Sequence, residues 1–86
     1  MWQVIATDRF SDWLRQLGKT DRARVLAGIY LLKEKGPHLA RPYADTVEGS
    51  EFSNMKELRV QSRGDPLRAF FVFDPTRKRC FIVCGQ

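Results

Sequence analysis

The first part of the chain carries one strand pattern followed by one helical pattern. Residues 2–7 form a short apolar run rich in strand formers, and either Thr7 or Asp8 can cap a following helix through a side-chain oxygen. Apolar residues then recur at the spacing of one helical face, at Phe10, Trp13, Leu14 and Leu17. A strand that leads into a helix of about two turns is therefore predicted.

A second helical pattern follows Gly18, which can end the first helix in a left-handed conformation. Thr20 is the next candidate cap, and the mostly apolar segment after it closes at Gly36 and Pro37. Its apolar positions are Val25, Leu26, Ile29, Tyr30 and Leu32. The two patterns predict a helical hairpin that turns around Gly18 and Lys19.

Residues 36–53 show no sustained period. Pro37, Pro42 and Gly49 interrupt them, so we predict a long loop, which inside a compact domain is usually functional. Four apolar side chains are expected to pin parts of this loop to the core: Leu39, Tyr43, Val47 and Phe52.

The rest of the chain predicts three strands in a meander. Residues 54–62 alternate, with Lys56, Leu58, Val60 and Ser62 on one face and Glu57, Arg59 and Gln61 on the other. Residues 67–74 hold four consecutive apolar side chains, which predict a central strand covered on both faces for part of its length. Residues 79–85 form the third strand, and turns separate the strands at 63–66 and 74–78.

The order of these elements is β-α-α-β-β-β. Helices that precede a meander predict one α+β domain over residues 1–86, a twisted and largely antiparallel sheet with the helical hairpin packed on one face. The first strand is expected at or near an edge of that sheet.

Net charge indicates the kind of binding partner, and the cysteine content indicates whether disulfides or metal ions are expected. The formal net charge of +5 favours polyanions such as RNA, DNA or an acidic protein segment, although a soluble basic protein with no such partner also fits. Cys80 and Cys84 lie about 13 Å apart on one strand, so we expect reduced thiols, and with His38 distant in sequence we expect no metal and no cofactor. Without a leader or a long apolar segment, the chain is expected to be cytoplasmic.

Arginine on the meander is the chief candidate for chemistry. No nucleophile motif or phosphate-cradling glycine loop is present, and one histidine excludes a two-histidine ribonuclease within a single chain. Residues 56–79 contain three acidic residues and seven basic residues, the latter being Lys56, Arg59, Arg63, Arg68, Arg77, Lys78 and Arg79.

Arg59 and Arg68 flank one turn, and antiparallel pairing would place them opposite each other. A phosphate could bridge two such guanidinium groups. The alternative is ordinary ion pairing, of Arg59 with Glu57, Glu48 or Glu51 and of Arg68 with Asp65 or Asp74.

Three segments of the meander resemble a known family. They are residues 54–60 (Asn-Met-Lys-Glu-Leu-Arg-Val), 63–71 (Arg-Gly-Asp-Pro-Leu-Arg-Ala-Phe-Phe) and 73–75 (Phe-Asp-Pro). Together with the N-terminal Trp-x-Val strand, they resemble the HigB-like, phage-related branch of the RelE/ParE toxin superfamily. The resemblance covers essentially the whole chain.

The resemblance implies a microbial-RNase-like fold and the toxin of a bacterial type II toxin–antitoxin pair. Such toxins inhibit translation by cleaving mRNA on the ribosome, with the 2′-hydroxyl of the transcript attacking the adjacent phosphate. By position, Arg68 is the expected transition-state stabiliser, Arg59 and Lys56 are expected to contact phosphate, and Lys56 is a candidate for proton transfer. Arg63, Arg77, Lys78 and Arg79 are expected RNA contacts, with simple solvation as the alternative for the last three.

The sequence departs from the family at its end. Members usually continue into a lysine-rich turn and a C-terminal helix, whereas this sequence ends at Gln86, so we expect a domain without that helix and possible homo-oligomers.

Two alternative functions stay open: a ParE-like inhibitor of DNA gyrase and a non-catalytic RNA-binding module. An antitoxin is the expected partner in every case, beside the ribosome and mRNA for the nuclease.

Overall fold

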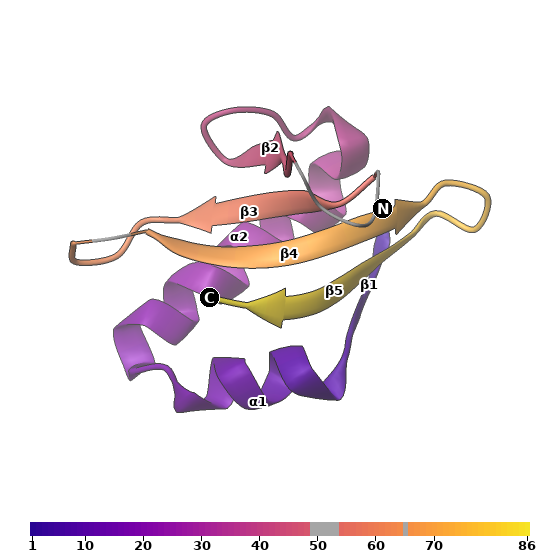
Figure 1. Ribbon diagram of the computed structural model, residues 1–86. Coiled ribbons are helices and arrows are strands. Elements are labelled where there is room, and N and C mark those ends of the chain that lie inside the picture. The colour runs from indigo at the N-terminus through magenta and orange to yellow at the C-terminus, as the bar shows by residue number, and fades with distance from the viewer. Residues whose placement is uncertain (49–53, 65) are drawn as a thin grey trace.

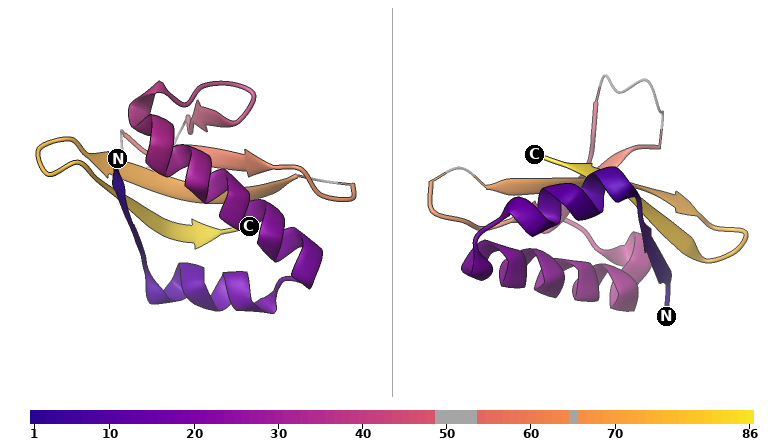
Figure 2. Two further views of the ribbon diagram at one scale, coloured as in Figure 1. Left: turned by 180° about the vertical axis from the view of Figure 1, so that it is seen from behind. Right: turned by 90° about the horizontal axis from the view of Figure 1, so that it is seen from below.

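The computed structural model describes residues 1–48, 54–64 and 66–86, which form a five-stranded sheet with two helices on one side (Figures 1 and 2). Its elements are β1 (Gln3–Ala6), α1 (Asp8–Gln16), α2 (Lys19–Lys35), the 3-10 turn η1 (Gly36–His38), β2 (Ala44–Thr46), β3 (Lys56–Val60), β4 (Leu67–Asp74) and β5 (Arg79–Gly85). The strand order is β1-β5-β4-β3-β2. Strand β1 runs parallel to β5 at one edge, and the other neighbours are antiparallel. The predicted α+β architecture is confirmed.

The segment predicted as a long loop is the main difference from the sequence-based expectation. It contains η1 and the three-residue strand β2, which pairs antiparallel with β3. A three-residue strand is too short to show a period of two, so only its pairing reveals it. Leu39 is buried as expected, but Tyr43 is 52% exposed, and Phe52 lies outside the described residues.

The junction between the helices also differs from the prediction in one respect. Thr7 caps α1 as predicted, because its Oγ1 accepts the backbone N–H of Phe10 at 3.2 Å. Gly18, however, has φ −62° and serves as the N-cap of α2, so it is not a left-handed stop and Thr20 is not the cap. Leu17 and Gly18 are both extended, and these two residues let α2 begin at Lys19.

The core lies between the helices and the sheet. Its largest fully buried side chains are Phe10, Val25, Leu32, Leu58, Phe71, Cys80 and Ile82. Two glycines permit close packing: a Cβ at Gly28 would lie 3.2 Å from Leu58, and one at Gly85 would lie 2.2 Å from the ring of Trp13. Helix α2 therefore contacts β3, and α1 contacts β5.

Strand β4 is central, but within the described residues helices cover only one of its faces. Ala69 and Phe71 are 1% exposed on the helical side, whereas Phe70 and Val72 are only half-buried. No helix of the described chain lies on the second side (Figure 2). The expectation of a strand covered on both faces is thus wrong for this part of the chain. One sheet face remains open, and we call it the open face.

The two free cysteines should differ in reactivity. Burial raises the pKa of the Cys80 thiol to about 12, whereas Cys84 is half-buried on β5. Because the thiolate is the nucleophile, we expect a disulfide reagent at pH 8 to label one thiol in the native protein and two after denaturation. Thiol counting by absorbance checks this. Native C84S should show no fast-reacting thiol, and rapid labelling of that variant would contradict the burial of Cys80.

Candidate active site

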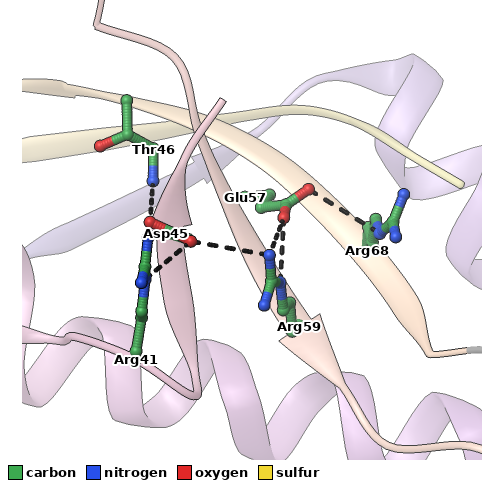
Figure 3. A network of polar contacts seen from close by, with 6 residues as sticks. All are labelled: Arg41, Asp45, Thr46, Glu57, Arg59 and Arg68. Carbon is green, nitrogen blue, oxygen red and sulfur yellow. Dashed lines mark hydrogen bonds and ion pairs between the residues drawn. The ribbon is translucent and has the colours of Figure 1, made fainter. Parts of the chain in front are cut away.

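Arg59 of β3 and Arg68 of β4 lie directly opposite each other, as predicted. Alternation along β3 places Glu57 on the same face as Arg59. Leu58 and Val60 point to the helices and are buried, so Glu57, Arg59 and Arg68 belong to the open face. Figure 3 shows these three side chains turned toward one another.

Glu57 bridges the two arginines. Both Nε and Nη2 of Arg59 lie 2.9 Å from its Oε1, and Nε of Arg68 lies 3.8 Å from its Oε2. The pairing of Arg59 with Glu57 is one of the alternatives named from the sequence. Arg68 does not pair with Asp74, which lies 4.0 Å from Arg77, and Asp65 lies outside the described residues.

Strand β2 adds a second carboxylate that the sequence did not single out. Asp45 is the register partner of Glu57, and its Oδ2 lies 3.6 Å from Nη2 of Arg59. The same oxygen accepts Nε of Arg41 at 2.9 Å. The sequence analysis missed Asp45 because it predicted a loop where β2 lies. Only a predicted strand tells which face of the sheet a side chain occupies.

These five side chains alternate in charge across the sheet, in the order Arg41, Asp45, Arg59, Glu57 and Arg68 (Figure 3). We call them the charge chain. Arg59 and Arg68 are 42% and 44% exposed, whereas Glu57 is 13% exposed. Exposed ion pairs contribute only about 0–1 kcal/mol each, so an incoming anion can take over guanidinium donors at little cost. A guanidinium group has five such donors.

Lys56 is not part of this cluster. It shares a face with Leu58 and Val60, and its Nζ lies 5.7 Å from the ring centroid of Phe73. Adjacent strand residues point to opposite faces, so a lysine next to Glu57 cannot join it on the open face without breaking the strand. The structure therefore does not bring this proton-transfer candidate to Arg59 and Arg68.

The other basic residues lie at the two ends of β4. Arg63, in the β3–β4 turn, lines a pocket of about 470 Å³ with the first turn of α2. Arg77 and Lys78 form the β4–β5 turn, and Arg79 pairs with Asp74 at the start of β5. That turn lies at the far end of β4 from Arg68 (Figure 1).

Within residues 1–48, 54–64 and 66–86, no group of three His, Cys, Asp or Glu side chains could hold a metal ion. None of the helices in the same ranges has the length and apolar character needed to cross a bilayer.

The backbone has the fold of the RelE toxins. It is similar to one chain of the toxin–antitoxin complex RelBE2 of Mycobacterium tuberculosis, with a TM-score of 0.79. It is also similar to one chain of the intact RelBE toxin–antitoxin complex of E. coli, with a TM-score of 0.73. The matches cover 99% of this chain in both cases, and 95% and 94% of those chains. The sequence identities are 14% and 13%, so these two structures define the fold.

The sequence identifies the family. Residues 12–86 match the family described as phage-derived protein Gp49-like (DUF891). HigB3 of M. tuberculosis, named as a toxin, is 39% identical over 83 residues, which are 96% of this chain and 71% of HigB3. HigB2 of the same organism, also named as a toxin, is 43% identical over 80 residues. That match covers 92% of this chain but only 40% of HigB2. The chain therefore belongs to the Gp49-like family, and HigB2 and HigB3 are its relatives.

The charge chain predicts an unusually acidic Asp45. The backbone N–H of Thr46 lowers the pKa of this carboxyl below its ordinary value of 3.8, and the guanidinium groups of Arg41 and Arg59 add to the shift. The ionised form is favoured in the fold, so its stabilising contribution is complete above about pH 4 and is lost as the pH falls through the lowered pKa.

Carboxyl-carbon NMR should show Asp45 titrating below 3.8, and R41Q should move the midpoint upward without restoring the ordinary value. R15Q, which removes the exposed partner of Asp12, is the matched control. A midpoint that R41Q leaves unchanged would contradict the contribution of Arg41.

Proposed function

We propose that this chain is the toxin of a type II toxin–antitoxin system and that it cleaves mRNA as an endoribonuclease. One observation carries the proposal: two opposed arginines with a carboxylate between them lie on the open face, in a chain whose relatives are named as toxins. The net charge of +5 suits an RNA substrate.

The reaction we propose is a transesterification that requires no metal. The 2′-oxygen of the transcript attacks the adjacent phosphorus and loses its proton, while the bond from phosphorus to the 5′-oxygen breaks. The leaving 5′-oxygen takes a proton from water, and the products are a 2′,3′-cyclic phosphate and a 5′-hydroxyl. The protein must hold the nucleotide in line for attack and stabilise the charge on the non-bridging oxygens.

Arg59 and Arg68 would bind those non-bridging oxygens. Guanidinium groups stay charged at any working pH and offer paired donors that suit phosphate oxygens. The two side chains face each other across β3 and β4, so one phosphate can contact both. Their substantial exposure leaves the donors accessible to RNA.

Glu57 is the proton acceptor in this proposal. Carboxylates, lysine and tyrosine are the remaining acid–base side chains when a histidine pair is absent, and Lys56 lies on the helical face. Glu57 already contacts both arginines, so a phosphate bound to them would lie beside its carboxylate. Transfer of Arg59 and Arg68 to the phosphate frees the Glu57 oxygens to accept the 2′-proton.

An antitoxin and the ribosome complete the proposal. Some of the solved structures that this fold resembles, such as RelBE2 of M. tuberculosis and RelBE of E. coli, are toxin–antitoxin complexes, which supports an antitoxin as partner. The basic surface favours an acidic or amphipathic antitoxin segment. We place the mRNA cleavage on the ribosome, in the cytoplasm.

Arginine variants test the nuclease. Primer extension on mRNA in a reconstituted translation reaction, with and without ribosomes, should show cuts that R68A and R59A each reduce about 10²- to 10³-fold, because a charge-stabilising donor is lost. R15A, which removes an exposed arginine of α1, is the matched control and should cut within a few-fold of wild type. Absence of cuts from the unmodified protein would refute the nuclease and favour a protein-contact toxin. Cuts that survive R68A would refute only the role proposed for Arg68.

An isosteric change tests the proton acceptor. E57Q keeps an oxygen for Arg59 but cannot accept the 2′-proton, so cleavage should fall about 10²- to 10⁴-fold. The acidic limb of the pH–rate profile should also disappear. E34Q, on the exposed side of α2, is the control, and thermal unfolding of both variants verifies the fold. Wild-type cleavage by E57Q would assign the proton transfer to another group.

A further inference from the structure

Tyr43 is a large aromatic side chain that the fold leaves 52% exposed beside the charge chain. It directly precedes β2, and its carbonyl accepts the backbone N–H of Arg59 at 2.8 Å. The β2–β3 register therefore sets Tyr43 opposite Arg59 at the edge of the sheet.

Tyr43 borders two surface hollows. The first has a volume of about 270 Å³ and is lined by Pro42, Tyr43, Arg59, Val60, Gln61 and Pro66. The second, of about 310 Å³, lies toward α2 and shares Tyr43, Arg59, Val60 and Gln61 with the first. Arg59 thus takes part in the charge chain and in both hollows.

We propose that Tyr43 and the first hollow form a subsite for a nucleobase of single-stranded RNA next to the scissile phosphate. This inference rests on the proposed nuclease function and adds to it a substrate contact outside the phosphate site. The aromatic ring offers a stacking surface, and two proline rings and Val60 supply apolar contacts. The exposed amide of Gln61 offers a donor and an acceptor for a base edge.

The position of Arg59 favours a nucleotide as the occupant. A base is covalently tied to its phosphate, so a phosphate on Arg59 holds the adjoining base near Tyr43. A positively charged groove beside an aromatic stacking surface is the usual arrangement for binding single-stranded nucleic acid. Leu26 and Tyr30, two large exposed hydrophobic residues of α2, line neither hollow.

The test separates base contacts from phosphate contacts. The probes are fluorescent tetranucleotides with 2′-O-methyl groups, which cannot be cleaved, and matched oligomers in which every base is replaced by an abasic unit. Fluorescence anisotropy at low salt measures affinity for wild type, Y43L, Y43F and Y30L. Tyr30 is the matched control because it is 59% exposed on α2.

We expect Y43L to weaken binding of the base-bearing oligomers about fivefold or more, while Y43F and Y30L stay close to wild type. Affinity for the abasic oligomers should not respond to Y43L, because these oligomers have nothing to stack. A separate measurement with R59A should weaken both kinds of oligomer.

Other outcomes overturn the inference in distinguishable ways. If Y43L leaves base-bearing oligomers unaffected, or weakens abasic ones equally, the subsite is absent while the nuclease proposal stands. If Y43L weakens only the complex with a protein partner, Tyr43 belongs to a protein interface. If neither kind of oligomer binds the wild-type chain and primer extension also shows no cuts, the proposed function fails together with the subsite.

Discussion

The pairing register of β3 with β4 is the constraint on which the rest of this structure depends. Leu58 pairs with Ala69, both are buried on the helical side of the sheet, and the closeness of Gly28 to Leu58 leaves little room for a shift. Because side chains alternate along a strand, the same register sends Arg59 and Arg68 to the open face as direct neighbours. A slip by one residue would bury these charges and expose the core. Hydrophobic packing on one side of the sheet thus positions the charged groups on the other side.

The charge chain shows how two arginines can lie opposite each other on neighbouring strands. Like charges opposite each other destabilise a sheet, and Glu57 offsets this repulsion by contacting both. Asp45 does the same for Arg41 and Arg59. The arginines are exposed enough to exchange partners, so in the proposed function the carboxylates would hold them in place until a phosphate takes over their donors. The groups that preserve the fold are then also the groups proposed to carry the chemistry.

Fold and function rest on different observations in this protein. The solved RelE structures have a similar backbone, but only about one residue in seven is identical to this chain. That similarity defines the fold, and one fold can host more than one activity. The relatives named HigB2 and HigB3 share far more of the sequence, including its C-terminal half. The proposed ribonuclease rests on the side chains of the open face, where Glu57 replaces Lys56 as the acid–base candidate.

Periodicity in the sequence sufficed for β1, α1, α2 and the three-stranded meander, and for the opposition of Arg59 and Arg68, because each depends on residues close in the chain. The alternation also placed Lys56 and Glu57 on opposite faces of β3. Only the packing of the helices decided which of these two faces of the sheet is the open face. Strand β2, Asp45 and Tyr43 emerged only from the tertiary structure. A three-residue strand has no pattern of its own, and its pairing with β3 alone brings a distant carboxylate and an aromatic ring to Arg59.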